Sequence, residues 1–401
     1  MNAAYVVGTC DTKYHELKYV CDRIKELGVP TVLVDVGSSE HGLAVDVTNE
    51  EVASYHPKGR RIVGQVDDRG EAVELMAESL SEFLPTRQDL GGVIGLGGSG
   101  GTSLVTTAMR RLAVGVPKVM VSTVASGDVS PYVGPNDIAM MYSVTDVAGI
   151  NRISRAVLGN AAHALAGMIK GAIPDPAEAK PAVGMTMFGV TTPCVTAVRE
   201  HLEADYDVLV FHATGTGGQS MEKLADSGML SGILDVTTTE VCDLFMGGVM
   251  SAGEDRFGAV IRTKLPYVGS VGALDMVNFG PKDTVPAKYA DRNLYVHNPQ
   301  VTLMRTTPEE NRRMGEWIAE RLNQCEGPVR FLIPEKGVSL IDAPGQPFHD
   351  PEADEELFSS IERTLKQTEH RKLITLPYNV NDAEFAEALV SNFREVMNTR
   401  G

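Results

Sequence analysis

Residues 91–102 carry the clearest chemical signal in the chain. They read Gly91-Gly-Val-Ile-Gly-Leu-Gly-Gly-Ser-Gly-Gly-Thr102, so a short apolar run passes into clustered glycines and two hydroxyl residues. A run compatible with a helix, residues 103–112, follows, which gives the order strand, glycine loop, helix. Glycines let the backbone approach a ligand closely, and the first N–H groups of a helix have no partner within it.

Such a corner is suited to binding an anion. We therefore predict that it holds the phosphates of a nucleotide or of another phosphorylated small molecule. The alternative is a tight turn that only allows close packing of helix on strand. The residues predicted to contact the ligand here are Gly97, Gly98, Ser99, Gly100, Gly101 and Thr102.

The same glycines partly match the dinucleotide-binding fingerprint G-x-G-x-x-G, over 95–100. That fingerprint expects an acidic residue closing the next strand, about 20 residues on. Here no acid occurs between the glycines and Asp128. Asp35 does close the second expected strand. However, the loop that precedes it in the fingerprint position, residues 8–13, holds a single glycine. A P-loop of the form G-x-x-x-x-G-K-[ST] is absent from the sequence, so we favour nucleotide or phosphate binding in general over nicotinamide binding.

A second candidate segment, residues 8–13, follows the first apolar strand, at the edge where open α/β sheets bind ligands. Thr9 and Thr12 offer hydroxyls, and Lys13 offers a positive charge. Asp11 is a candidate Mg²⁺ contact, and Asp35 is placed to accept a ribose hydroxyl. In the alternative interpretation, Asp11 or Thr12 caps the following helix, Lys13 is solvated and Asp35 is a turn residue.

A polar loop after the fourth strand supplies Ser126, Gly127 and Asp128. If neighbouring strand ends meet, this loop lies beside the glycine loop. We expect ligand contacts from all three residues and a second Mg²⁺ contact from Asp128. A purely structural loop is the alternative.

The second half of the chain adds a histidine before another glycine corner. His212 precedes Gly217 and Gly218, which we predict to contact the cofactor, and Asp235 and Glu240 lie farther along. His212, Asp235 or Glu240 could act as general acid or base. The alternative is a hydrogen-bonded histidine at a strand end and a helix start rich in threonine. Two glycine corners together suggest a cleft between two domains.

Strand-like and helix-like patterns alternate along the chain, which predicts an α/β protein with two Rossmann-like, doubly wound domains and mainly parallel sheets. The expected strands are 4–7, 31–36, 93–96, 116–122, 182–187, 207–212, 331–334 and 372–376, and the expected helices include 14–27, 71–84, 102–112, 150–170, 307–323 and 382–397. Three prolines within residues 171–181 mark a linker. We therefore place the domains at 1–178 and 179–401.

Composition excludes several classes of protein. The 401 residues carry a formal charge of −17, which argues against non-specific binding of nucleic acid or of anionic membranes. No apolar run is long enough to span a bilayer, and no basic leader with a long apolar stretch opens the sequence. Five scattered cysteines without a C-x-x-C pair fit reduced thiols. We expect a soluble cytoplasmic protein.

Four blocks of the sequence resemble one known family. These blocks, 8–13, 95–102, 121–128 and 211–218, are similar to the ATP-binding domain family named after the tomato mosaic virus resistance protein. The resemblance implies two Rossmann-like domains, ATP bound mainly by the first, and homodimers. It places ATP contacts at Thr9, Asp11, Thr12 and Lys13 and in the loop 97–102. In the plant protein this domain inhibits viral replication by binding the replication protein.

Three functions remain open at this stage. The chain could be a metabolic enzyme of unassigned reaction that uses ATP and Mg²⁺. It could be a non-catalytic binding module regulated by a nucleotide. It could also act on a sugar phosphate or organic-acid phosphate without any nucleotide.

Overall fold

The computed structural model describes residues 2–38, 42–59, 68–171, 173 and 179–398, and the chain divides into two compact units, 1–175 and 176–401. The predicted linker, 171–181, lies largely outside the described residues, as does part of the polar stretch 37–65.

Unit 1 (residues 1–175) is built on five parallel strands. They are β1 (Ala3–Gly8), β2 (Thr31–Asp35), β3 (Leu90–Gly97), β4 (Lys118–Ser122) and β5 (Ala139–Tyr142), in the order β2-β1-β3-β4-β5. Along β1, Tyr5 and Val7 pack into one core and Val6 into the other. A strand buried on both faces reads as a continuous apolar run, which is why 4–7 could be predicted.

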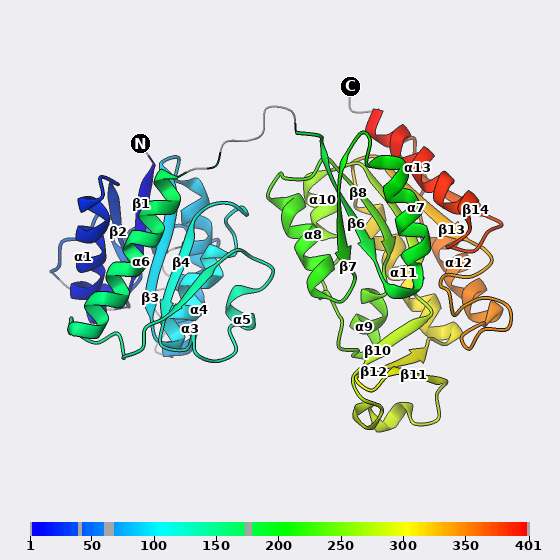
Figure 1. Cartoon of the computed structure of the whole chain (residues 1–401), viewed down its shortest axis with the longest axis horizontal. Helices are drawn as coiled ribbons and strands as arrows, with labels where there is room; N and C mark the ends of the chain where they lie inside the picture. Colours follow the sequence, from blue (N-terminus) through cyan, green and yellow to red (C-terminus); the bar gives the residue numbers. More distant parts are fainter. Residues whose placement is uncertain (1, 39–41, 60–67, 172, 174–178, 399–401) are drawn as a thin grey trace. The chain divides into compact units, whose positions relative to one another are not determined.

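Helices cover both faces of this sheet (Figure 1). α1 (Cys10–Glu26) and α6 (Arg152–Lys170) pack on one face, whereas α2 (Asn49–Ala53), α3 (Arg69–Phe83) and α4 (Ser99–Met109) pack on the other. The short η1 (Leu84–Thr86) follows α3, and α5 (Ser130–Val133) lies between β4 and β5 in the chain. Leu17, Val20 and Ile24 form the buried stripe of α1, at the spacing a helix requires.

The strand order creates a switch point in unit 1. From β1 the chain goes to β2 on one side of β1 and later to β3 on its other side. In open α/β sheets, ligands bind at the carboxyl ends of the strands at such a point. The residues that follow β1 and β3 therefore occupy the most favourable position for a ligand in this unit.

Unit 2 (residues 176–401) contains a parallel sheet of six strands. They are β6 (Ala182–Met187), β7 (Asp207–His212), β8 (Gly232–Thr237), β9 (Tyr267–Gly272), β13 (Val329–Pro334) and β14 (Arg371–Leu376), in the order β14-β13-β9-β8-β6-β7. α7 (Thr192–Leu202), which follows η2 (Gly189–Thr191), and α13 (Ala383–Asn398) pack on one face. The other face carries α8 (Thr216–Asp226), α9 (Glu240–Met246), α10 (Gly258–Thr263), α11 (Pro308–Asn323) and α12 (Pro351–Thr364).

A smaller antiparallel sheet, which the sequence patterns did not predict, is attached to unit 2 (Figure 1). Its strands are β10 (Met276–Phe279), β11 (Leu294–Asn298) and β12 (Val301–Arg305), in the order β10-β12-β11. Between β10 and β11 lie η3 (Lys282–Thr284) and η4 (Ala287–Tyr289). The two parallel sheets confirm the predicted α/β class with Rossmann-like units.

Two predicted helix starts were placed too late. α1 begins at Cys10 and α4 begins at Ser99, so the segments interpreted as ligand loops are the first turns of helices. Glycine has a low helix propensity and hid the start of α4 in the sequence. Among the described residues, no helix combines the length and the apolar content that crossing a bilayer would need.

Substitution by alanine should change the free energy of unfolding differently at Gly97, the last residue of β3, and at Gly100, in the first turn of α4. A Cβ on Gly97 would lie 2.9 Å from the backbone of Gly101, whereas one on Gly100 would meet nothing within 4 Å. We expect Gly97→Ala to lower the free energy of unfolding by about 1–3 kcal/mol, because β3 and α4 must separate. Gly100→Ala should leave it unchanged or raise it by up to about 1 kcal/mol. Urea denaturation of both variants measures this, and equal stabilities would contradict the packing described.

Candidate functional site

The structure brings the predicted residues of unit 1 to one edge of its sheet. Residues 9–13 follow β1, 98–102 follow β3, Asp35 ends β2 and 126–128 follow β4. All of these strands are parallel, so their carboxyl ends meet at one side. We refer to this as the unit 1 edge.

The first turn of α4 presents unpaired backbone amides at this edge. Gly98 is the N-cap residue, and no side chain caps the helix. Among the described residues, no group accepts a hydrogen bond from the amides of Ser99, Gly100 or Gly101, and the first paired amide is that of Thr102, on Gly98 O. The turn contains no acidic residue, and Ser99 and Gly100 are exposed. It therefore carries partial positive charge without an internal acceptor.

The glycines of this turn have no packing function of their own. A Cβ on Gly98 would come no closer than 3.7 Å to any atom, one on Gly101 no closer than 3.6 Å, and one on Gly100 would have open space. None of the three has the positive φ that requires glycine. Gly97 differs, because it allows β3 to pack on α4. The absence of side chains at 98, 100 and 101 therefore leaves room outside the protein, above the amides.

Thr102 positions this turn from within the protein. It is fully buried, and its hydroxyl donates to Gly98 O (2.7 Å) and lies 2.6 Å from the hydroxyl of Ser122. Ser122 in turn accepts from Val124 N. These contacts fix the start of α4 to the end of β4, and a direct contact of Thr102 with a ligand remains a prediction.

The segment after β1 combines a cation and a carboxylate. Lys13 donates from Nζ to Val147 O at 2.6 Å, and its departure from helical geometry kinks α1. Oδ1 of Asp11 is shielded from solvent and has no hydrogen-bond partner among the described residues. Thr9 is the N-cap residue of α1 and its hydroxyl pairs with that of Thr12 at 2.8 Å. Neither Asp11 nor Thr12 caps α1, contrary to the alternative interpretation.

Asp35 has a structural role that the sequence did not reveal. It is 1% exposed, and its Oδ1 accepts hydrogen bonds from Cys10 N and Gly37 N, both at 2.9 Å. The carboxylate thus holds the start of α1 against the end of β2. That Asp35 also binds a ribose hydroxyl remains a prediction.

The loop after β4 remains open to solvent. Ser126, Gly127 and Asp128 are exposed, and Gly127 N donates to Val124 O. Hydrogen bonds from the hydroxyl and amide of Ser130 lower the pKa of Asp128. Asp128 is therefore an accessible carboxylate, and its contact with a ligand remains a prediction.

A metal ion at this edge would need coordinating oxygens from a ligand in addition to those of the protein. Among the described residues, no three His, Cys, Asp or Glu side chains cluster closely enough to hold one. Mg²⁺ usually enters such sites with phosphate, using one or two protein carboxylates and several waters. The unpartnered oxygen of Asp11 suits that mode of binding.

The glycine corner of unit 2 is filled by the protein itself. Glu240 Oε1 accepts hydrogen bonds from Gly215 N (2.8 Å) and Gly218 N (3.0 Å). A Cβ on Gly218 would collide with the Glu240 carboxylate, and one on Gly217 would collide with His212 O. These two glycines therefore serve internal packing, and a contact of Gly217 and Gly218 with a cofactor remains a prediction.

Glu240 belongs to a buried network around Arg256. The guanidinium donates to both carboxylate oxygens of Asp235 (2.7 and 2.8 Å), to Glu240 (2.8 Å) and to Glu222 (3.1 Å). Thr186 and Tyr267 also donate to Asp235. Burial raises the pKa of Glu240 and of Glu222, and the Arg256 charge opposes this.

All four charged side chains of the network are at least 90% shielded from solvent. This geometry supports a structural function for Asp235 and Glu240, and a catalytic one remains an untested prediction. Sequence analysis missed Arg256 because neither a motif nor a spacing connects it to these acids.

His212 is the accessible member of the predicted catalytic set. It ends β7, is exposed, and its ring lies 5.3 Å from that of Phe188. Within the described residues, no hydrogen bond joins its side chain to Asp235 or Glu240. Its catalytic role remains a prediction.

A second buried charged cluster lies around Arg305, at the end of β12. Asp354 accepts from Arg305 at 2.7 Å, and Asp342 lies beside both. Burial and the neighbouring Asp342 raise the pKa of Asp354 to about 8 and that of Asp275 to about 7. Among the described residues, Asp342 Oδ1 lacks a donor, and a proton on Asp354 would supply one.

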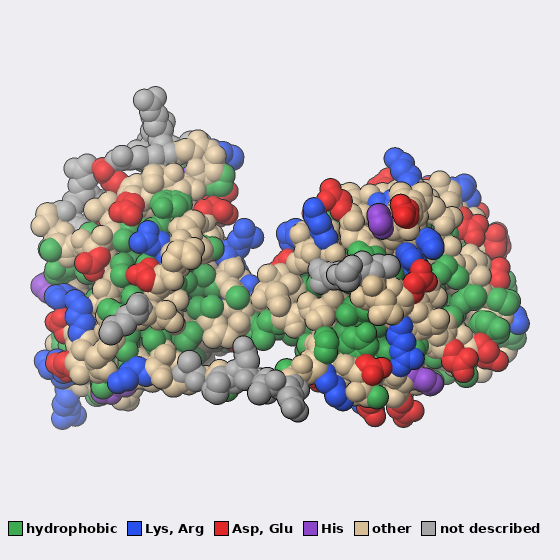
Figure 2. Space-filling view, turned by 90° about the horizontal axis from the view of Figure 1, so that it is seen from above, with side chains coloured by type: hydrophobic (Ala, Val, Ile, Leu, Met, Phe, Trp, Pro, Cys, Tyr) green, Lys and Arg blue, Asp and Glu red, His purple; other side chains and the backbone are tan. Residues whose placement is uncertain are grey.

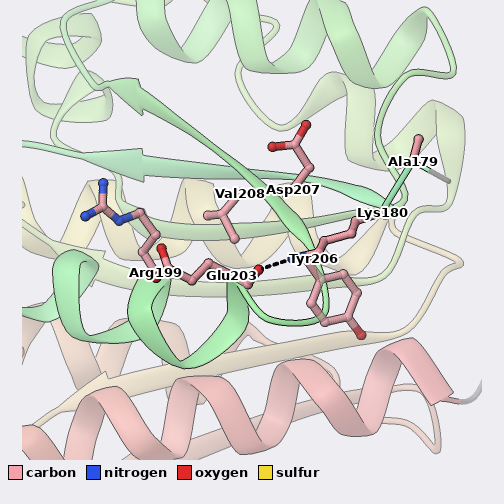
Figure 3. A pocket seen from close by; sticks show the side chains of 7 residues that line it. All are labelled: Ala179, Lys180, Arg199, Glu203, Tyr206, Asp207 and Val208. Carbon is pink, nitrogen blue, oxygen red and sulfur yellow. Dashed lines mark hydrogen bonds between the residues drawn. The ribbon is translucent and has the colours of Figure 1, made fainter. Parts of the chain in front are cut away.

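A shallow hollow of about 530 Å³ lies at the opposite end of the unit 2 strands (Figure 3). Lys180, Arg199, Glu203, Tyr206 and Asp207 line it, and Lys180 Nζ donates to Glu203 O. These residues precede β6 and β7 or end α7, away from the carboxyl ends of the strands. Acidic and basic side chains are interspersed on the face shown in Figure 2. Because both basic and acidic side chains line the hollow, its charge does not favour an anionic ligand.

Comparison with known proteins finds similarity along the whole chain. The N-terminal domain model of the uncharacterised protein family UPF0261 matches residues 2–174, and its C-terminal domain model matches 180–397. A UPF0261 protein of Rhizobium meliloti is 58% identical over 99% of this chain and 100% of its own length. The ToMV resistance protein Tm-1 of Solanum lycopersicum is 46% identical over 98% of this chain, which corresponds to 55% of the tomato protein.

Solved structures add little. A dinucleotide-forming acetyl-coenzyme A synthetase of Ca. Korarchaeum cryptofilum aligns with 99% of this chain and 96% of its own, at 9% identity and a TM-score of 0.16. That score is too low to indicate a shared arrangement.

Removing the cation of the Arg256 network should be severely destabilising. Arg256→Met leaves three buried carboxylates unpaired, and we expect a loss of about 3–5 kcal/mol in the free energy of unfolding. The control is Arg262→Met in α10, which breaks the exposed pairs with Asp226 and Asp255. That control should cost less than about 1 kcal/mol. Urea denaturation compares the two, and similar losses would refute the role assigned to Arg256.

The Arg305 cluster predicts a pH dependence of stability. Because the pKa values of Asp275 and Asp354 are raised on folding, their stabilising contribution is full below about pH 4, the usual value, and is lost as pH rises to 7–8. The free energy of unfolding should therefore fall between pH 5 and pH 8. Asp354→Asn keeps an acceptor for Arg305 and a donor for Asp342, so this variant should lose less stability over that range. A slope identical to that of the unmodified protein would exclude Asp354 as a source.

Proposed function

Because the chain belongs to the uncharacterised protein family UPF0261, whose description carries no activity, we propose a function from the site itself: unit 1 binds ATP, with the phosphates on the first turn of α4. The resemblance to the family of the tomato resistance protein is confirmed by the 46% identity, and it is this resemblance that implies ATP. The single observation that carries the proposal is the open, uncapped turn at Ser99–Gly101.

The electrostatics of the unit 1 edge favour phosphate at that place. With 53 acidic and 36 basic residues, the chain as a whole repels an anion, so binding requires local positive potential. The start of α4 supplies it through three unpaired amides, and the helix dipole adds to their effect. Lys13, in the first turn of α1 after the neighbouring strand β1, supplies a full charge and uses one of its three donors on Val147 O.

Mg²⁺ is part of the proposal. A triphosphate brings more negative charge than one lysine and three amides offset, and Mg²⁺ bound to its oxygens reduces the difference. The Asp11 carboxylate and the exposed Asp128 would orient the waters or the ion, since each offers an accessible or unpartnered oxygen.

The proposal concerns binding and leaves turnover to experiment. Asp235 and Glu240 are enclosed in the Arg256 network, and they offer no free base. Both an enzyme and a nucleotide-regulated binding module are compatible with the same phosphate site. The predicted homodimer and cytoplasmic location also await measurement.

Side chains introduced into the turn should remove ATP binding without unfolding the protein. Gly98 is the N-cap residue next to the unpaired amides, so the branched side chain of a valine there would occupy the open space beside them. We expect Gly98→Val to weaken ATP–Mg²⁺ binding at least tenfold, about 1.4 kcal/mol, by isothermal titration calorimetry. Gly100→Ala should weaken it as well.

The matched control is Gly167→Ala in α6, another helical glycine whose Cβ would meet nothing within 4 Å. It should bind ATP as the unmodified protein does. Retention of full ATP affinity by a folded Gly98→Val protein would disprove the phosphate site. Binding of a phosphorylated metabolite but not ATP by the unmodified protein would favour the enzyme without a nucleotide.

A further inference from the structure

The segment after β5 is the second unusual feature of the unit 1 edge. Ser143 N donates to Ser122 O at 3.1 Å and so continues the β4–β5 ladder by one residue. Thr123 N donates to Gly97 O at 3.2 Å in the same way, across β3 and β4. Residue 143 is therefore two strand spacings from Gly97, about 10 Å, which an extended nucleotide can span.

Val144 adopts a strained backbone conformation at this position. Its φ is +65°, a left-handed value that branched side chains rarely take. Thr145 N donates to Ser143 O at 2.7 Å, so the three residues form a tight turn with Val144 at its tip. A glycine or asparagine would adopt this geometry at lower cost.

Neighbouring groups hold the strained turn in place. Ser143 is 4% exposed, and its hydroxyl donates to Thr145 O at 2.6 Å. Farther along, Val147 is buried and accepts from Lys13 Nζ, while Gly149 N donates to Glu16 of α1. Lys13 thus touches both the segment after β1 and the segment after β5, and the turn is fixed on both sides.

The strained turn and the strand end before it expose apolar side chains to solvent. Val144 is 56% exposed and Tyr142, the last residue of β5, is 42% exposed. Single exposed apolar side chains are ordinary, but a strained turn that exposes a valine two residues after an exposed tyrosine is not explained by folding. At the opposite edge strand of the sheet, β2, the terminal residue Asp35 is buried and accepts hydrogen bonds from backbone amides. That strand end therefore exposes no comparable apolar surface through Asp35.

We infer that Tyr142 and Val144 bind the nucleobase of the nucleotide whose phosphates lie on α4. An aromatic ring and a branched aliphatic side chain suit a flat, uncharged ring system, since bases stack on aromatic side chains regardless of their hydrogen-bonding edges. The inference rests on the proposed ATP site and adds the direction of the ligand, from the start of α4 past β4 toward β5. It assigns recognition of the base to apolar contact and predicts weak discrimination among purines.

The test compares ATP with inorganic tripolyphosphate, which has the phosphates but no base. In the unmodified protein, ATP should bind at least tenfold more tightly. Tyr142→Ala and Val144→Gly should each weaken ATP binding about tenfold and leave tripolyphosphate binding unchanged. Val144→Gly should also raise the melting temperature or leave it unaltered, because glycine relieves the strain. Tyr295→Ala, which alters a 38% exposed tyrosine of β11 in unit 2, is the matched control and should change neither affinity.

The outcomes separate the two proposals. Equal affinity of the unmodified protein for ATP and tripolyphosphate would overturn the nucleobase contact and leave the phosphate site standing. Unchanged ATP affinity in both variants would also overturn the contact. If the unmodified protein binds neither ligand, both proposals fail.

Discussion

Backbone amides at the start of a helix need an acceptor, and the two units of this protein meet that need differently. In unit 2 the corner after β7 receives the carboxylate of Glu240, which accepts from two backbone amides. In unit 1 the corner after β3 receives no group from the described part of the chain, and its glycines leave the space above the amides clear. The same strand–glycine–helix element is thus closed by a side chain in one unit and left uncapped by the described residues in the other.

The Glu240 carboxylate that accepts the amides of the unit 2 corner is itself held by a network of buried charged side chains. A buried carboxylate requires a partner, and Arg256 supplies the cation. Arg256 then binds Asp235 and Glu222, and Glu222 accepts the amides of Phe257 and Ala259 at the start of α10. Strand β8 and helices α8, α9 and α10 are thereby joined through one guanidinium.

In unit 1 the elements around the open turn are fixed by short polar contacts. Thr102 ties α4 to β4 through Ser122, and Asp35 ties α1 to β2. Lys13 reaches from α1 to the segment after β5, next to the strained turn at Val144. Each contact joins two neighbouring elements, so the surface of the unit 1 edge is fixed by the protein's own hydrogen bonds. A preformed site loses little conformational freedom on binding.

The sequence by itself determined the fold class, most strand positions and the first glycine corner, because these depend on local patterns. Buried parallel strands such as β1 read as apolar runs, and the glycines after β3 are visible as a cluster. It could not show that α4 begins within those glycines, nor could it reveal the three antiparallel strands of unit 2. Local propensity is weak at both places.

Only the tertiary structure decided which candidate residues are free to act. In the sequence Asp35 and Thr102 look like ligand contacts and Glu240 like a catalytic acid or base, yet each forms a hydrogen bond with a group 20 or more residues away. Arg256 and Val144 carry no local signal, and only burial and backbone geometry single them out. Whether a polar group is satisfied depends on partners distant in the chain, and spacing along the sequence does not contain that information.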